Sequence, residues 1–183
     1  KIDAVYIASP NKLHIEQARV FLEHGKHVIC EKPLSAHAKD VAELQALAKE
    51  RGLIYLEAIM FMHLPQRKLL EEALKKIGDI SVAKIDFCQR SSKYDAYLAG
   101  SLPNIFNPTL ETGALMDLGV YCVYPALYLF GKPQNTLAVS HLLASGADGS
   151  DIVAMQYPDK LVNLVFSKVG QAGANTDFQG TNG

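Results

Sequence analysis

The sequence predicts an α/β protein of two parts: a partial doubly wound domain with a parallel sheet, followed by an α+β domain with a large, mostly antiparallel open sheet. Two observations predict it. Up to about residue 58, short apolar runs alternate with amphipathic helical stretches, as in strands buried between covering helices. After Glu57, several runs alternate apolar and polar residues, which is typical of antiparallel strands with one wet face. We therefore expect domains at 1–60 and 61–183.

The first domain is expected to alternate three strands with two helices. Its first strand is a nearly continuous apolar run closed by Ser9-Pro10-Asn11, which favours a strand buried on both faces. Gly25 and Gly52 follow the two helical stretches, at the position where glycine commonly ends a helix. The expected elements are strand 4–8, helix 12–24, strand 26–30, helix 38–51 and strand 53–56.

The second domain is expected to combine helices with amphipathic strands. Gly78 and Gly131 end its two helical stretches, and a polar loop lies between them. The glycine-rich tail at 170–183 is interpreted as turns whose following strands are cut off. The expected elements are helix 66–77, strand 81–87, loop 92–110, helix 113–130 and strands 136–143, 152–157 and 161–166.

Charge and cysteine usage exclude several classes of partner. Eighteen basic residues oppose nineteen acidic ones, so no strong field attracts nucleic acid or an anionic membrane, and a small-molecule ligand is expected. No long apolar run predicts a membrane span. Cys30, Cys88 and Cys122 are odd in number and widely spaced, which favours a reducing, cytoplasmic compartment over a disulfide framework. His24 and His27 have no evident third ligand, so no metal site is predicted.

Two segments follow neighbouring strands at the end where ligands bind in open α/β sheets. Ser9-Pro10-Asn11 follows the first strand and Glu31-Lys32-Pro33 follows the second, so both are expected to line one crevice. A charged residue before proline is, by itself, more often simple turn chemistry. The position after the strands is what favours a ligand site.

The helix at 113–130 is expected to carry two different faces. Its polar side chains Asp117, Tyr121, Tyr124 and Tyr128 recur at spacings of four, three and four, which places them on one stripe. The other stripe is apolar and faces the core. For Tyr124 and Tyr128 we favour amphipathic packing with the hydroxyls at the surface.

Four segments together resemble the glucose-fructose oxidoreductase and inositol dehydrogenase (Gfo/Idh/MocA) family, over nearly the whole chain. They are Ala8-Ser9-Pro10-Asn11 with His14, the run GKHVICEKPL from Gly25 to Leu34, Glu57-Ala58 with Pro65-Gln66, and the run GALMDLGVY from Gly113 to Tyr121. The resemblance implies a Rossmann NAD(P)-binding domain and a second domain whose open sheet often forms a dimer interface. It therefore implies a homodimer or homotetramer, and NAD or NADP as cofactor.

The resemblance also implies roles for individual residues. Lys32 would approach the substrate hydroxyl and the nicotinamide, and Asp117 would orient the substrate or the acid/base. Tyr121 resembles the branch with glucose-fructose oxidoreductase and dimeric dihydrodiol dehydrogenase, in which a tyrosine donates or accepts the proton. The cofactor would contact Ser9, Pro10, Asn11, His14, Glu31 and Lys32.

The chemistry of these residues agrees with such an activity. Removing a hydride from an alcohol leaves a hydroxyl proton that needs a base, and a free phenol titrates near 10. A neighbouring ammonium favours the phenolate, so Lys32 beside Tyr121 would help it accept the proton. The implied function is NAD(P)-dependent hydride transfer to or from a sugar, polyol or related cyclic alcohol. A cis peptide is expected at Lys32–Pro33, where the turn must aim the lysine into the crevice.

Several features depart from the family pattern. Met62 and Leu64 stand where many tyrosine-branch relatives have a basic residue and a histidine. The sequence begins within a strand and holds no GxGxxG loop and no acidic or basic residue that would separate NAD from NADP. We therefore expect a truncated part of a longer protein, inactive by itself.

Two other functions stay open. One is an NAD-dependent glycosidase of the same family, which oxidises a sugar transiently, and the other is a non-catalytic sensor or binding protein. Retention of Lys32, Asp117 and Tyr121 favours an enzyme. Self-association is also expected, because apolar residues such as Val139, Val153 and Val165 would line an exposed sheet face.

Overall fold

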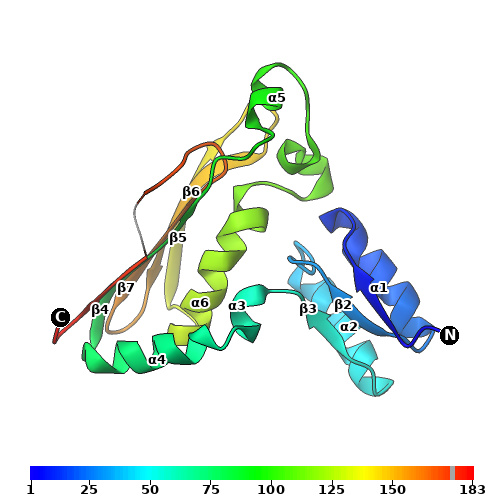
Figure 1. Ribbon diagram of the computed structural model, residues 1–183, viewed down its shortest axis with the longest axis horizontal. Coiled ribbons are helices and arrows are strands. Elements are labelled where there is room, and N and C mark those ends of the chain that lie inside the picture. The colour runs from blue at the N-terminus through cyan, green and yellow to red at the C-terminus, as the bar shows by residue number, and fades with distance from the viewer. Residues whose placement is uncertain (174–175) are drawn as a thin grey trace.

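The computed structural model describes residues 1–173 and 176–183 and contains two sheets (Figure 1). Sheet A is wholly parallel and has the order β1-β2-β3. Its strands are β1 (Ala4–Ile7), β2 (His27–Cys30) and β3 (Tyr55–Glu57), separated by α1 (His14–Glu23) and α2 (Ala38–Glu50). This alternation of parallel strands and helices confirms the predicted partial Rossmann domain.

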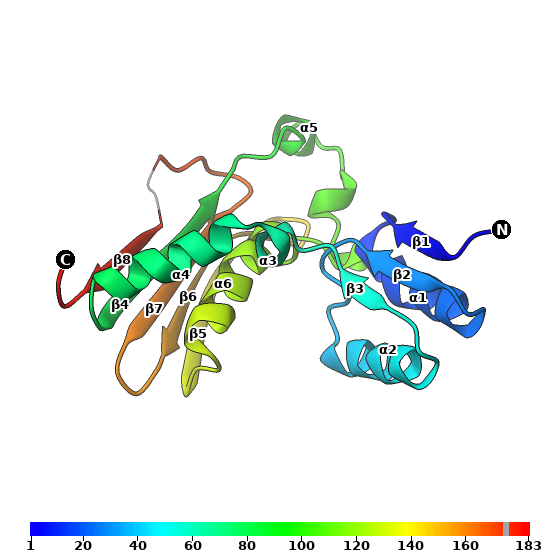
Figure 2. The same cartoon turned by 60° about the horizontal axis from the view of Figure 1, so that its bottom comes forward.

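Both helices of the first domain lie on the same side of sheet A (Figure 2). Leu22 and Leu44 are fully buried there, against strand residues such as Val28. On the opposite side Tyr6, 56% exposed, and Leu56, 46% exposed, are uncovered. The expectation that these strands are buried on both faces is therefore wrong for the described residues, because both connecting helices pack on one face.

Sheet B has five strands in the order β5-β6-β7-β4-β8. Among the strand pairs that the structure describes in sheet B, only β4–β7 is parallel, so the prediction of a mostly antiparallel sheet is confirmed. The short strand β8 pairs with β4, which corrects the interpretation of the tail as turns alone. The strands are β4 (Ile80–Cys88), β5 (Asn135–Leu142), β6 (Asp148–Gln156), β7 (Leu161–Ser167) and β8 (Asp177–Gly180).

The helices of the second domain include two that periodicity predicted. These are α4 (Gln66–Lys76) and the helix that ends at Phe130, whose first turn, Leu115–Gly119, is π-helical and whose remainder is α6 (Val120–Phe130). The 3₁₀ turns Asn104–Phe106 and Pro108–Leu110 and the short helices α3 (Met60–His63) and α5 (Tyr94–Leu98) were not predicted. Part of the polar loop at 92–110 is thus helical. In the first domain, a 3₁₀ turn at Asn11–Leu13 takes the place of the start of the helix predicted at 12–24.

The helix that ends at Phe130 forms the core with one face of sheet B (Figure 1). Leu118 and Cys122 are buried against strand residues such as Leu164. The helical segment Pro108–Phe130 is long and apolar enough to cross a membrane by length and composition alone, contrary to the sequence expectation. Its contacts with sheet B are those of a core helix.

The other face of sheet B carries uncovered apolar side chains. Leu137 is 69% exposed, Val139 66% and Ile152 54%. Val153, in contrast, is buried, because the β5–β6 register pairs Val139 with Ile152 and turns Val153 toward the helix. The expectation that Val153 lies on the open face is wrong, and Ile152 takes that position.

Asp151 is a buried carboxyl within sheet B. It lies on β6 opposite Phe166 and is 6% exposed, and its Oδ2 atom has no hydrogen-bond partner among the described residues. Burial and the neighbouring Asp148 carboxyl raise the pKa of Asp151 to about 6, although Ser140 acts in the opposite direction. Ionised Asp151 is therefore unfavourable in the fold.

We predict that Asp151→Asn removes part of the pH dependence of stability. A carboxyl whose pKa is higher in the folded than in the unfolded state stabilises the fold at low pH, and this contribution is lost as pH rises. For Asp151 the loss runs from its ordinary value of 3.8 to about 6. Urea unfolding at several pH values should show this fall in unfolding free energy in the original chain and a smaller fall in Asp151→Asn.

The matched control is Asp3→Asn, which removes an exposed carboxyl. Asp3→Asn should leave the fall in unfolding free energy between pH 3.8 and about 6 as it is in the original chain. If the unfolding free energy falls by the same amount over this pH range in the original chain and in Asp151→Asn, the prediction is contradicted.

Candidate functional site

The two predicted loops meet at the carboxyl ends of β1 and β2. Ile7 and Cys30 are paired at the ends of these strands, and the Glu31 amide donates to the Ile7 carbonyl at 2.8 Å. His14, at the start of α1, is fully buried between the loops. Its Nδ1 lies 2.8 Å from the Pro33 carbonyl and its Nε2 lies 2.9 Å from the Ser9 carbonyl. His14 therefore joins the two loops.

The polar side chains of the first loop are also held by the protein. Ser9 Oγ donates to Gln17 at 2.7 Å, and Asn11 Nδ2 donates to the Glu111 carbonyl at 2.8 Å. The second contact connects the loop after β1 with the segment just before the π-helical turn. In this structure Ser9 and Asn11 shape the crevice through these contacts, and their predicted contacts with a cofactor stay a prediction.

The three predicted catalytic residues lie together. The peptide bond Lys32–Pro33 is cis, which confirms the sequence prediction. Lys32 Nζ donates to Asp117 Oδ1 and to the Asp117 carbonyl, both at 2.7 Å, and lies 5.0 Å from the centre of the Tyr121 ring. An ammonium over an aromatic face is an attractive contact. The loop of the first domain thus places its cation against the helix of the second.

Lys168 is a site residue that sequence reasoning missed. Its ammonium donates to Asp117 Oδ2, so that one carboxylate lies between two lysines. Burial alone would raise the pKa of Asp117, but the hydrogen bonds and charges of Lys168 and Lys32 outweigh burial and lower it. The only signal in the sequence is a lysine directly after an apolar strand, which is also common at ordinary strand ends.

The π-helical turn positions Asp117 and Tyr121. A Cβ atom on Gly119 would lie 2.8 Å from the Phe166 ring, so glycine lets the turn approach β7 closely. Tyr121 follows on α6 and packs edge-on against Phe87 of β4, with the ring centres 5.6 Å apart. Single π-helical turns occur frequently at functional sites.

A second contact between the domains passes through Glu57, at the end of β3. Its carboxylate accepts hydrogen bonds from the Tyr124 hydroxyl and from the Leu34 amide, the latter at 3.1 Å. Burial raises the pKa of Glu57, against the opposing effects of the Leu34 amide, His14 and Lys32. The expectation that the Tyr124 hydroxyl lies at the surface is wrong, because the hydroxyl is bonded to Glu57.

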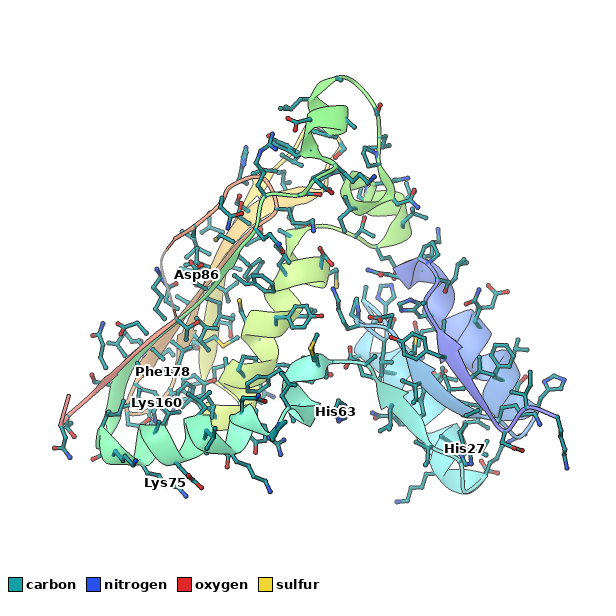
Figure 3. The ribbon with its side chains drawn as sticks, in the orientation of Figure 1. His27, His63, Lys75, Asp86, Lys160 and Phe178 are labelled. Atoms are coloured by element: carbon teal, nitrogen blue, oxygen red, sulfur yellow. The ribbon has the colours of Figure 1, made fainter. Side chains whose placement is uncertain are left out.

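A cavity of about 520 Å³ lies between the uncovered face of sheet A and the second domain. Its walls combine apolar side chains with a few polar groups, among them the Tyr121 phenol. The lining residues are Tyr6, Ile29, Glu31, Leu56, Glu57, Ala58, Met60, His63 and Tyr121. Figure 3 shows His63 on α3, between the two sheets. In the sequence His63 stands between Met62 and Leu64, the two residues that depart from the family pattern. An apolar cavity with a few convergent polar groups is typical of a small-molecule site.

The described residues contain no cluster of three or more His, Cys, Asp or Glu side chains that could hold a metal ion. The chemical groups that do converge are two ammoniums, one carboxylate and one phenol. Such a set can orient a hydroxyl and exchange a proton with it. It therefore suits acid–base chemistry on an alcohol or a carbonyl.

Comparisons with known proteins agree with this geometry. Residues 1–59 match the family model described as "Oxidoreductase family, NAD-binding Rossmann fold", and residues 67–183 match the "GFO/IDH/MocA C-terminal domain". A solved 3-ketoreductase from Actinomadura kijaniata, in complex with NADP and TDP-benzene, superposes with a TM-score of 0.86 at 29% identity. The similarity covers 98% of this chain and 55% of that one.

Two curated relatives are similar over almost the whole chain. A scyllo-inositol 2-dehydrogenase (NADP(+)) of Bacillus subtilis is 45% identical over 99% of this chain and 55% of its own length. A trans-1,2-dihydrobenzene-1,2-diol dehydrogenase of Mus musculus is 30% identical over 100% of this chain and 54% of its own length. The chain thus spans about half the length of these relatives, and with both domain models matched it belongs to the Gfo/Idh/MocA oxidoreductase family.

Proposed function

We propose that the protein containing this chain is an NAD(P)-dependent oxidoreductase that acts on a cyclic polyol, a sugar or a related cyclic alcohol. The observation that carries the proposal is the convergence of Lys32, Asp117 and Tyr121 next to the cavity. The relatives named above are an inositol dehydrogenase, a dihydrodiol dehydrogenase and a 3-ketoreductase. These names support a ring-shaped substrate.

The residues around the cavity fit a nicotinamide cofactor. The crevice lies beyond the carboxyl ends of parallel strands, where α/β folds bind nucleotides. Ile29, Leu56 and Met60 give the cavity apolar walls, and Glu31 supplies a carboxylate for a ribose hydroxyl. When bound, the nicotinamide supplies or takes the hydride. The residues proposed to contact it are Ser9, Pro10, Asn11, Glu31 and Lys32, and the buried His14 is proposed to contribute by holding their two loops together.

The side chains of this chain would perform the proton chemistry. Tyr121 would accept the proton of the substrate hydroxyl during oxidation and return a proton during reduction. Lys32 would hold the substrate oxygen and stabilise negative charge that develops on it. Asp117 would fix the position of the Lys32 ammonium through the contact at 2.7 Å.

We also propose that the protein forms homodimers or homotetramers through the bare face of sheet B. Contiguous apolar patches of this kind are uncommon on monomers. Leu137, Val139 and Ile152 all lie on this face and are more than half exposed. A cytoplasmic location is part of the same proposal, supported by the three cysteines, all of which are free thiols.

Replacing Tyr121 by Phe should lower turnover by about 10²- to 10⁴-fold, because it removes the group that exchanges the proton. Cofactor affinity should stay nearly unchanged. The measurement is the absorbance of NADPH in the complete protein, with scyllo-inositol and other cyclic polyols as substrates. Tyr128→Phe is the matched control, since Tyr128 donates to Glu71 at the surface and should not affect turnover.

Tyr121→His distinguishes loss of a proton donor from loss of packing. Histidine titrates at about 6.5, so a variant that retains activity with a more acidic pH profile identifies this position as the acid/base. An unchanged rate in Tyr121→Phe at every pH would assign the proton transfer to another residue. Release of a free sugar without net NADPH formation would indicate the glycosidase reaction instead.

Replacing Lys32 by Met should be at least as harmful to turnover as Tyr121→Phe, because it removes both a substrate contact and a positive charge beside the phenol. The same NADPH assay measures it. Lys12→Met, which removes an exposed lysine near the first loop, is the control for charge. Turnover of Lys32→Met equal to that of the control would contradict the role given to Lys32.

Replacing Val139 by Lys should dissociate the assembly, because it places a charge in the proposed apolar interface. Light scattering coupled to size-exclusion chromatography measures the mass in solution. Ser92→Lys adds the same charge on an exposed loop and should leave the mass unchanged. A monomeric original protein at high concentration would refute the proposed interface.

A further inference from the structure

Lys168 is buried to an extent that is unusual for lysine. It is 6% exposed, and lysines are almost never buried unless they are paired. Its main chain is fixed on both sides: the amide donates to the Gly149 carbonyl at 2.8 Å, and the carbonyl accepts from the Ser91 amide at 2.8 Å. Strand β6 and the segment after β4 therefore hold the main chain at Lys168 in one place.

The direction of Lys168 follows from the strand that precedes it. Side chains two residues apart in an extended segment point to the same side. Phe166, two residues earlier, packs against Gly119 of the π-helical turn. Lys168 is the first residue after β7, and its contact with Asp117, two residues before Gly119, places its side chain on that side as well. The close approach of the π-helical turn to β7 at Gly119 thus brings Asp117 near the end of the strand that Lys168 follows.

The charges of this cluster do not cancel. Lys32 and Lys168 contribute two positive charges and Asp117 one negative charge, which leaves a net charge of +1. If Lys168 were neutral, Asp117 would pair with Lys32 alone and the cluster would carry no net charge. The second ammonium therefore makes the potential beside the Tyr121 ring, which lies 5.0 Å from Lys32 Nζ, more positive than Lys32 and Asp117 alone would.

We propose that Lys168 is a positioning residue, which fixes the Asp117 carboxylate and leaves the charge of Lys32 available to the reacting oxygen. The proposal rests on the function proposed above for Lys32, Asp117 and Tyr121. Lys168 acts through Asp117 and needs no contact with substrate or cofactor.

The first test measures the Asp117 carboxyl directly and needs neither substrate nor cofactor. Carbon-13 NMR of the labelled carboxyl, assigned with Asp117→Asn, gives its pKa in the chain. Lys168→Met should raise this pKa, because it removes a hydrogen bond and a positive charge, and Lys168→Arg should restore it. Lys132→Met, which removes an exposed lysine, is the matched control and should leave it unchanged.

The second test measures turnover in the complete protein. Lys168→Met should lower kcat by on the order of 10²-fold through misplacement of the reacting groups. It should also move the half-maximal rate of the oxidation to higher pH, which loss of packing alone would not do. Lys168→Arg should recover most of the rate. In an Asp117→Asn background, Lys168→Met should cause little further loss, because the two residues act through one contact.

The outcomes separate this proposal from the proposed function. An unchanged Asp117 pKa in Lys168→Met, or losses that add fully in the double variant, would overturn the role of Lys168. Absence of any hydride transfer by the unaltered protein would overturn the proposed function and leave the NMR result standing. If circular dichroism shows that Lys168→Met is unfolded, a failure of Lys168→Arg to keep the Asp117 pKa low and a full rate would still overturn the proposal.

Discussion

The contact on which the rest of the site depends is the carboxylate of Asp117 between Lys32 and Lys168. Three distant segments of the chain meet there: the loop after β2, the π-helical turn and the end of β7. Burying charged groups costs free energy that only good pairing offsets, and loss of one partner leaves an uncompensated charge. The arrangement of the two domains and the chemistry of the site therefore depend on the same atoms.

The hydrogen bonds of Glu57 form a second connection between the loop that follows β2 and the helix of the second domain. Glu57 accepts from Leu34, two residues after Lys32, and from Tyr124, three residues after Tyr121. The loop that carries Lys32 is thus attached to the helix that carries Tyr121 at two points. Rigid attachment matters for the proposed reaction, because small displacements of a catalytic group have large effects on rate.

Much of the fold was predictable because its longer elements have a clear hydrophobic period. The helix predicted at 38–51 is Ala38–Glu50, and the strand predicted at 161–166 is Leu161–Ser167. Strand β8 was missed because its four residues depend on pairing with β4, a distant partner in the sequence. Val153 was placed on the wrong face because alternation along a strand does not give the register between strands.

The candidate site was predicted in part, for a comparable reason. Lys32, Asp117 and Tyr121 belong to sequence motifs that resemble the family. Lys168 follows an ordinary apolar strand, and only its tertiary contact with Asp117 identifies it as a site residue. No particular residue composition identifies a π-helical turn in a sequence, yet this turn determines where Asp117 lies relative to β7. A helix stripe read at α-helical spacing groups Asp117 with Tyr121, but it cannot show that Asp117 meets the end of the sheet while Tyr121 lines the cavity. Under the proposed function, this division lets one helix hold the charge cluster through Asp117 and present the proposed proton-transfer group, Tyr121, to the cavity.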